Sequence, residues 1–286
     1  MFPFELSPQQ LELVEKPVQG AIFLQGIAGT GKTTTAVARM QEMLRNGIRA
    51  DSILVLVPQR TLAGPYLDAL RDPTRAAGSE VTVVTLGGLA RRMIELFWPL
   101  IAEEAGFENP ERPPLFLTLE TAQYYMAQIV SPLLEKERYF ESISIQRNRL
   151  YSQILDNLNK AAVVGFSHEE IGARLKAAWI GETSQAVIYD QAQTCASLFR
   201  QACLSRNLLD FSLQIEVFQE HLWPIPLFQE YREDRFRHLV VDNLEEDTPV
   251  THDLLIEWLP AFESALLIYD DHGGYRRFLG ADPVHA

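Results

Sequence analysis

The octet GIAGTGKT occupies residues 26–33, shortly after an apolar run at residues 21–24 that predicts a buried strand. Its glycines let successive backbone N–H groups point at phosphate oxygens, Lys32 would bring an ammonium group to the β- and γ-phosphates, and the Thr33 hydroxyl can ligate Mg²⁺. An accidental glycine-rich turn is the alternative, and the flanking strand and helix patterns argue against it. The residues expected to contact a nucleotide in this phosphate-binding loop and just after it are Gly26, Gly29, Thr30, Gly31, Lys32, Thr33 and Thr34.

Apolar runs and helical patterns alternate along the first third of the chain and again near its end. Continuous apolar strands separated by helices are typical of a parallel sheet covered on both faces, so the expected fold class is α/β. Between these two parts the pattern is helical without a convincing strand, which predicts a mostly helical inserted subdomain. The expected strands cover residues 21–24, 53–57, 81–84, 238–241 and 265–268, and the expected division is 1–94 and 232–286 for the sheet domain and 95–231 for the insert.

The chain has 286 residues, a hydrophobic content of 47% and a net charge of −13. This composition can fill buried cores, but it argues against a freestanding electrostatic binder of nucleic acid, because phosphate contacts need clustered Lys and Arg. The charge is uneven, with 10 basic against 9 acidic residues in positions 1–100 and 15 against 29 in positions 101–286. Any surface that faces a polyanion is therefore expected mainly in the first hundred residues.

The two cysteines, Cys195 and Cys203, lie eight positions apart in one helical stretch, about 12 Å along the axis, which is too far for a disulfide. Free thiols are typical of a reducing cytoplasm. The sequence shows neither a signal peptide nor an apolar run long enough to span a bilayer. We therefore expect a cytoplasmic protein, monomeric in isolation, without a membrane partner.

A second part of the nucleotide site is expected after the strand at residues 238–241. Asp242 ends that strand, where a carboxylate can hold the water shell of Mg²⁺; an ordinary turn aspartate is the alternative. The next residue is Asn243, whose amide can hydrogen-bond a water molecule but cannot act as a general base at neutral pH. The acidic residues 245–247 follow closely, and we expect their side chains to leave the strand end in other directions.

Six further segments occur in a fixed order along nearly the whole chain. Gln10 is the last residue of a Leu-Ser-Pro-Gln-Gln run that precedes the loop. Residues 53–63 and 85–91 each lie where a predicted strand is followed by a polar turn and a helix, and residues 270–282 form the last segment. The other two segments are residues 208–213 and residues 236–242. As an ordered set they resemble the glutamine motif, motif Ia, the single-strand-contacting segment, the end of the helical subdomain, motif II and motif III of UvrD/Rep/PcrA-type superfamily-1 DNA helicases.

The resemblance implies a first RecA-like domain, interrupted by a helical subdomain, that binds ATP and Mg²⁺ with Gln10 at the adenine. It also implies a second RecA-like domain, in a longer chain or a partner protein, whose arginines reach the γ-phosphate. The expected nucleic acid is single-stranded DNA, and solvated surface side chains are the alternative interpretation of the basic candidates. The candidate nucleic-acid contacts are Arg60, Arg91, Arg276 and Phe278.

The chain departs from the family pattern close to the phosphates. Asn243 stands where the family has its catalytic Glu, and Gly273 stands where it has a γ-phosphate-sensing Gln. Glu245 replaces a Gln and Thr34 replaces an Arg. Because loss of a general base lowers a rate by about 10²- to 10⁴-fold, we expect weak ATP hydrolysis or none, and whether the chain is an enzyme stays open.

Three functions are compatible with these patterns. The leading hypothesis is the ATP-binding, DNA-binding N-terminal motor domain of a UvrD/Rep-like helicase, with a role in DNA repair. The alternative is a non-catalytic helicase-like scaffold or interaction subunit of a DNA-repair or nuclease complex, which would bind protein through the acidic insert. The third is an ATPase unrelated to nucleic acid, which predicts no binding of single strands even at low salt.

Overall fold

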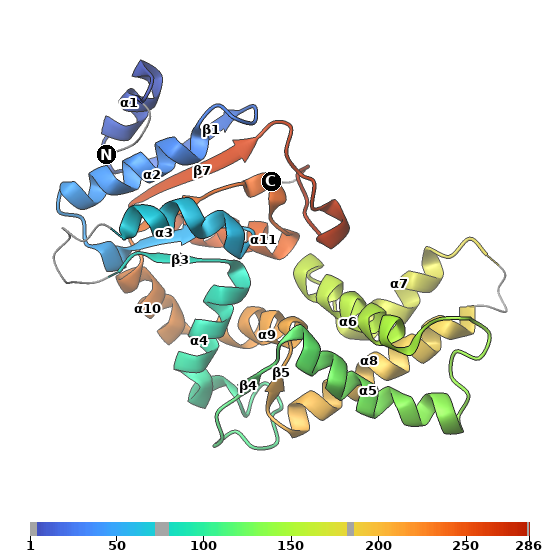
Figure 1. The fold of residues 1–286 in the computed structure, drawn as a ribbon. Helices are drawn as coiled ribbons and strands as arrows, with labels where there is room; N and C mark the ends of the chain where they lie inside the picture. Colours follow the sequence, from blue (N-terminus) through green and yellow to red (C-terminus); the bar gives the residue numbers. More distant parts are fainter. Residues whose placement is uncertain (1–4, 72–79, 182–185, 285) are drawn as a thin grey trace. The chain divides into compact units, whose positions relative to one another are not determined.

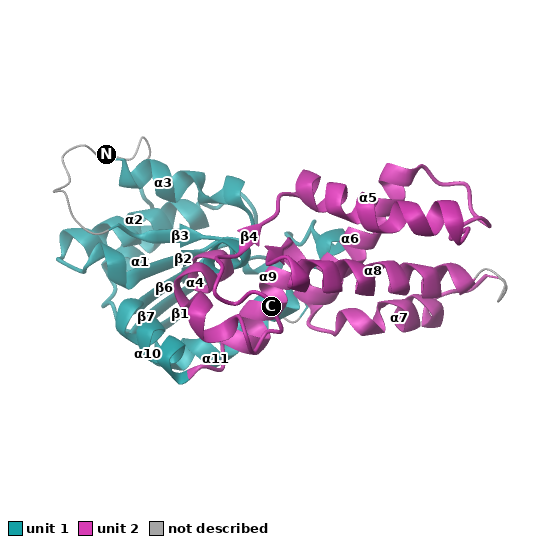
Figure 2. Cartoon of the chain, turned by 90° about the horizontal axis from the view of Figure 1, so that it is seen from below, with its two compact units in different colours: residues 1–89, 226–286 teal, residues 90–225 magenta. Residues whose placement is uncertain are grey.

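A computed structural model describes residues 5–71, 80–181, 186–284 and 286. The chain divides into two compact units, which Figure 2 shows in teal and magenta. Unit 1 combines residues 1–89 with residues 226–286, and unit 2 is the continuous segment 90–225. The part of the chain with the alternating strand and helix pattern therefore forms one unit from two separate segments.

Unit 1 is built on a five-stranded sheet in which every pair of neighbouring strands is parallel. The strand order is β1-β7-β6-β2-β3. Each of the five apolar runs predicted from the sequence coincides with a strand to within one or two residues at either end, and the α/β fold class is confirmed (Figure 1). The strands are β1 (Gly20–Gly26), β2 (Ile53–Leu56), β3 (Thr82–Val84), β6 (His238–Val241) and β7 (Ser264–Asp270).

Helices cover both faces of this sheet. In Figures 1 and 2, α2 and α3 lie on one face and α10 and α11 on the other. Every residue of β2 and β6 is buried, which explains why these strands, apart from His238 at the start of β6, are apolar rather than alternating. The helices of this unit are α1 (Pro8–Glu15), α2 (Lys32–Arg45), α3 (Gly64–Leu70), α10 (Pro226–Arg235), α11 (Pro249–Trp258) and the start of α4 (Leu86–Ile101).

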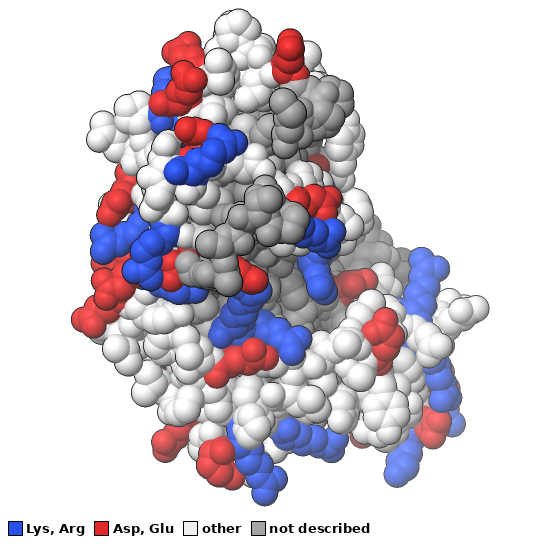
Figure 3. Space-filling view, turned by 60° about the vertical axis from the view of Figure 1, so that its left-hand side comes forward, with Lys and Arg blue, Asp and Glu red and all other residues white. Residues whose placement is uncertain are grey.

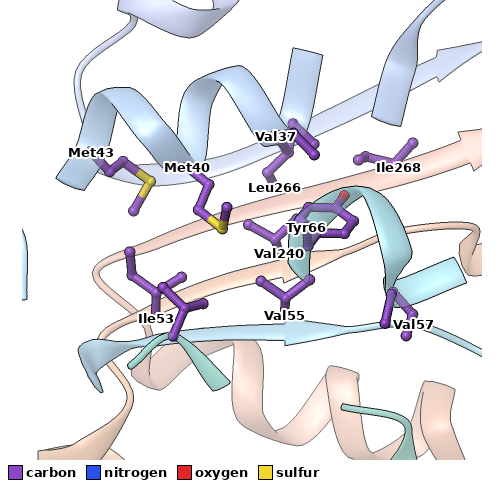
Figure 4. Close-up of a cluster of buried hydrophobic side chains, with 13 residues drawn as sticks. Val37, Met40, Met43, Ile53, Val55, Val57, Tyr66, Val240, Leu266 and Ile268 are labelled. Carbon is purple, nitrogen blue, oxygen red and sulfur yellow. The ribbon is translucent and has the colours of Figure 1, made fainter. Parts of the chain in front are cut away.

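The core beneath α2 and α3 is an apolar cluster shown in Figure 4. Met40 of α2 packs with Val55 of β2, Val240 of β6 and Leu266 of β7, which all project from the same face of the sheet. Burial of a side chain of this size stabilises a fold by roughly 1.5–3 kcal/mol. Tyr66 of α3 belongs to the same cluster and is fully buried, although it carries a hydroxyl group.

Unit 2 is mostly helical, as the sequence predicts, but it also contains two short strands that the sequence analysis missed. Strand β4 (Leu115–Phe116) pairs in parallel with β5 (Leu208–Leu209). Two residues are too few to produce a periodic pattern, so the expectation of no strand in this region was wrong for a physical reason. The helices of this unit are the rest of α4, then α5 (Leu119–Lys136), α6 (Arg147–Val164), α7 (Ile171–Ala177), α8 (Val187–Ser205) and α9 (Phe211–Val217).

A buried ion pair fixes the end of unit 2 that follows β5. Asp210 caps α9 by accepting hydrogen bonds from the backbone N–H groups of Ser212 and Leu213. Its Oδ1 atom also accepts a 3.1 Å bond from Arg200 of α8, and both side chains are buried. Removing one partner of such a pair leaves an uncompensated buried charge, so the pair ties α8 firmly to α9.

Candidate nucleotide-binding site

The phosphate-binding loop connects the end of β1 to the start of α2 in unit 1. Gly29 and Gly31 have φ angles of +81° and +80°, in the left-handed region that glycine adopts without strain. Gly31 is the N-cap residue of α2 and has no side chain with which to cap the helix. The first N–H groups and the positive end of the helix dipole therefore face the loop, an arrangement that favours anions.

Lys32 lies at the first position of α2 and its ammonium group is held at the edge of the sheet. Nζ donates 2.8 Å hydrogen bonds to the carbonyl oxygens of Gly26 and Ile27. It also lies 3.4 Å from Oδ2 of Asp270, the last residue of β7. Gly26 and Asp270 are register partners in the sheet, which explains how the two segments meet. The sequence marks Asp270 as a strand end, but the pairing of β1 with β7 that makes it a neighbour of Lys32 is not visible there.

Gln10 reaches the loop from α1. Ser7 and Gln10 form a reciprocal capping box at the start of this helix, with each side chain bonded to the other residue's backbone N–H. The Gln10 Nε2 atom also donates a 3.2 Å hydrogen bond to the carbonyl oxygen of Thr30. A β-carbon at Gly31 would lie 2.6 Å from that Nε2 atom, so a glycine is needed here for the approach. The structure thus brings Gln10 and the loop together.

Asp242 follows β6 and is 1% exposed. Its Oδ2 atom accepts a 2.9 Å hydrogen bond from the hydroxyl of Tyr66, a residue that the sequence analysis did not single out. Burial raises the pKa of the Asp242 carboxyl group, and the neighbouring hydroxyls of Tyr66 and Thr33 act in the opposite direction. The Oδ1 atom has no hydrogen-bond partner among the described residues. An unpaired carboxylate oxygen beside a threonine hydroxyl fits a Mg²⁺ ion, which prefers oxygen ligands and retains several waters.

Asn243, which the resemblance aligns with the family's catalytic Glu, has a φ angle of +59°. Asn adopts this left-handed conformation more readily than most residues, so the replacement suits the local backbone. Its Nδ2 atom donates a 3.4 Å hydrogen bond to Oε1 of Glu245. The amide side chain therefore points toward another side chain of the same turn.

For Glu245, the expectation that the acidic side chains after Asn243 leave the strand end in other directions was wrong, because Glu245 reaches Asp270 beside Lys32. The Oε2 atom of Glu245 accepts a 2.9 Å hydrogen bond from the backbone N–H of Asp270. The Oε1 atom of Glu246 accepts bonds of 3.1 and 3.0 Å from the N–H groups of Gly274 and Tyr275. A short 3₁₀ turn at 244–246 curls the chain back against the segment after β7, which a strand-end pattern does not reveal. Burial raises the pKa of Glu245, and the hydrogen bond from Asp270 opposes that shift.

The candidate nucleic-acid residues are divided between the two units. In unit 1, Phe278 is 70% exposed and Arg60 is exposed on a 3₁₀ turn. Arg276 is half-buried instead, and its Nη1 atom donates a 2.8 Å hydrogen bond to the carbonyl oxygen of Pro58. Arg91 belongs to unit 2, where it pairs with Glu95 and its guanidinium carbon lies 4.6 Å from the ring centre of Phe116.

Two further observations concern the surface charge and the side chains that could bind a metal ion. On the face shown in Figure 3, basic and acidic side chains are interspersed rather than separated into large patches of one sign. Among the described residues, no group of three or more His, Cys, Asp or Glu side chains is arranged to hold a metal ion.

The parallel sheet, the loop and the residues around it define a phosphate-binding-loop domain of the RecA-like type. The chain belongs to the UvrD/REP helicase N-terminal domain family, whose model matches residues 6–283. It is similar to the ATP-dependent DNA helicase UvrD2 of Mycobacterium bovis and of two strains of Mycobacterium tuberculosis. Each is 23% identical over 290 residues, which cover 97% of this chain and 38% of the relative. The chain therefore spans about two fifths of the length of these curated relatives.

Among the described residues, no helix is both long enough and apolar enough to cross a membrane.

Proposed function

We propose that this chain binds ATP and Mg²⁺ and serves as the N-terminal motor domain of a UvrD/Rep-like DNA helicase. The observation that supports this most is the meeting of three strand ends at one edge of the sheet. The loop follows β1, Asp242 follows β6, and Asp270 ends β7 beside Lys32. Parallel α/β sheets bind their ligands at the carboxyl ends of the strands, so these groups occupy the expected place.

Each residue then has a definite role. The backbone N–H groups of the loop and Lys32 would bind the phosphates, while Gln10 would read the adenine from α1. Thr33 and Asp242 would hold Mg²⁺, which when bound supplies positive charge to the phosphate oxygens. Lys32 would exchange its hydrogen bonds to the loop carbonyls for phosphate oxygens, because a phosphate is the stronger, charged acceptor.

Hydrolysis by this chain alone should be weak or absent. Asn243 cannot accept a proton at neutral pH, and its amide is directed to Glu245. The arginines that neutralise charge on the γ-phosphate would come from a second RecA-like domain, in a longer chain or in a partner. The exposed Phe278 and Arg60 would contribute to a path for single-stranded DNA, where aromatic stacking and phosphate contacts act together.

The alternative is a helicase-like scaffold that holds nucleotide or DNA without turnover, within a DNA-repair or nuclease complex. The observation that favours it is the environment of Gly273. The side chain of Glu245 fills the space next to Gly273. The γ-phosphate-sensing Gln of the family is therefore not only missing at position 273; another side chain occupies the space beside this position.

Titration with a fluorescent ATP analogue in the presence of Mg²⁺ tests the proposal. We expect micromolar binding that Lys32→Ala abolishes, whereas Lys16→Ala, an exposed lysine at the end of α1, leaves it unchanged. No binding at millimolar nucleotide would rule the proposal out. A DNA-stimulated ATPase assay on the chain joined to its second domain separates the two functions, since turnover above that of Lys32→Ala excludes a pure scaffold.

A further inference from the structure

The hydroxyl group of Tyr66 is the polar exception in an apolar core. Figure 4 shows the ring among the side chains of Val240, Leu266 and Ile268, with its oxygen at the edge of the cluster. The whole residue is 0% exposed. Burying a hydroxyl is unfavourable unless it is hydrogen-bonded, and its partner here is the Oδ2 atom of Asp242 at 2.9 Å.

Tyr66 acts as the donor in this hydrogen bond. A phenol carries its proton at neutral pH, and an ionised carboxylate oxygen can only accept a hydrogen bond. A charged acceptor makes such a bond stronger than one between neutral groups. The contact therefore restrains the rotation of the Asp242 carboxylate about its own side-chain bonds.

The two oxygens of Asp242 are thereby made different. Oδ2 is occupied by Tyr66, while Oδ1 is buried and has no partner among the described residues. Thr33, the second residue of α2, lies beside the same carboxyl group. A half rotation of the carboxylate would only exchange its two equivalent oxygens. The orientations that the Tyr66 hydrogen bond disfavours are the intermediate ones, in which neither oxygen meets the Tyr66 hydroxyl.

We propose that Tyr66 is a positioning residue that orients Asp242 so that Oδ1 faces the cation bound with the nucleotide. The inference rests on the proposed binding of ATP and Mg²⁺, and it assigns to α3 a part in that site. Tyr66 touches neither nucleotide nor cation; it acts through Asp242 alone. Its loss should therefore weaken the contribution of Mg²⁺ to nucleotide affinity and leave the affinity for free nucleotide intact.

The test compares affinity for the fluorescent ATP analogue with Mg²⁺ and with EDTA. In Tyr66→Phe we expect the gain in affinity from Mg²⁺ to fall about tenfold, in line with loss of one hydrogen bond to a charged group. The affinity in EDTA should stay within about twofold of the wild type. Tyr269→Phe is the matched control, because it loses a 3.0 Å bond to the carbonyl oxygen of Pro283 instead, and its Mg²⁺ gain should be unchanged.

A double-mutant cycle shows whether Tyr66 acts through Asp242. In an Asp242→Asn background, Tyr66→Phe should have no further effect on the Mg²⁺ gain. An equal loss in that background, or an unchanged gain in Tyr66→Phe alone, overturns the inference. Should Tyr66→Phe fail to fold, as judged by circular dichroism, Tyr66→Met replaces it in both titrations, since it keeps an apolar side chain without the hydroxyl.

The wild-type titration separates failure of the inference from failure of the proposed function. Absence of nucleotide binding in the wild type overturns the proposed function and the inference together. Mg²⁺-dependent binding in the wild type that Lys32→Ala abolishes, with the same Mg²⁺ gain in Tyr66→Phe, overturns only the role of Tyr66.

Discussion

Glu245 occupies the space that a side chain at residue 273 would need. A β-carbon added to Gly273 would lie 2.5 Å from both Cγ and Oε1 of Glu245. Glu245 is 1% exposed, and its Oε2 atom is fixed by the backbone N–H of Asp270, so it has little freedom to move aside. The two departures from the helicase pattern at Glu245 and Gly273 are therefore linked: the side chain of Glu245 occupies the volume that a side chain at position 273 would need.

Gly273→Ala should destabilise unit 1 by about 1–3 kcal/mol, the usual cost of overpacking a filled site. Glu245→Ala in the same chain should recover most of that loss, because the clash is with its side chain. Urea denaturation of the single and double variants measures the coupling. Gly64→Ala is the control, since a β-carbon there meets nothing within 4 Å. If the changes in the free energy of unfolding for Gly273→Ala and Glu245→Ala were additive, the two side chains would not compete for the same space.

Asp247 should make the protein less stable as pH rises toward neutrality. Burial raises the pKa of this carboxyl group from 3.8 to about 7, against the opposing effects of the Thr251 hydroxyl and the charge of Arg276. Between these values the folded chain retains a proton that the unfolded chain has released, so stability falls with increasing pH, by at most about 1.4 kcal/mol per unit.

Asp247→Asn removes this titration. Relative to the wild type, the variant should therefore be more stable at pH 8 than at pH 5, as measured by urea denaturation at both values. The control is Asp253→Asn, which changes an exposed carboxylate of α11. The same stability difference at both pH values would mean that Asp247 is ionised throughout this range in the folded protein.

Phe278→Ala should weaken binding of single-stranded DNA by about 1–3 kcal/mol, the usual contribution of one aromatic–base stack. Fluorescence anisotropy with a labelled oligothymidine at low salt measures the effect. Ile256→Ala serves as control because Ile256 is a similarly exposed apolar residue on α11, 72% exposed against 70% for Phe278. If the two variants bind equally well, Phe278 does not stack on DNA.

The two cysteines should be inert in the folded protein. Both are free and buried in α8, and burial raises the pKa of Cys195 to about 12 and raises that of Cys203 as well. Because the thiolate is the reactive form, neither should react with a thiol reagent at pH 8 until the chain unfolds. We expect no thiol to react in the native protein and two thiols per chain to react in denaturant. A rapid reaction of either thiol in the native protein would show that α8 opens.

The sequence was sufficient for most of the sheet because β2 and β6 are buried on both faces. The strand at residues 21–24 was found as well, but the expectation that it is buried was wrong, because β1 lies at the edge of the sheet and its residues are half-buried or exposed. The runs at residues 53–57 and 239–241 are apolar throughout, a pattern that needs no tertiary information to recognise. Strands β4 and β5 lacked such a signal because each has two residues and depends on its partner. The phosphate-binding loop was equally clear, since the residues of that site are contiguous.

The rest of the site depends on contacts between distant segments. Tyr66 gave no signal because a tyrosine in an amphipathic helix is usually a core residue, and its hydroxyl gains meaning only beside Asp242. Asp270 and Glu245 likewise acquire their partners through the pairing of β1 with β7 and the turn after β6. Arg276 was predicted to face nucleic acid, but a half-buried hydrogen bond to Pro58 engages its guanidinium group.

The strand order has a consequence for synthesis of the chain on the ribosome. In the part of the chain that the structure describes, strand β1 pairs with β7 alone, and Lys32 meets Asp270 across 238 positions of sequence. At about 5–20 residues per second, the first strand waits some 10–50 s for its neighbour. Unit 2 is one uninterrupted segment and is synthesised in full before β6 and β7. The phosphate-binding loop is thus among the first parts translated, yet its surroundings are completed last, and until then its apolar strand is a target for chaperones.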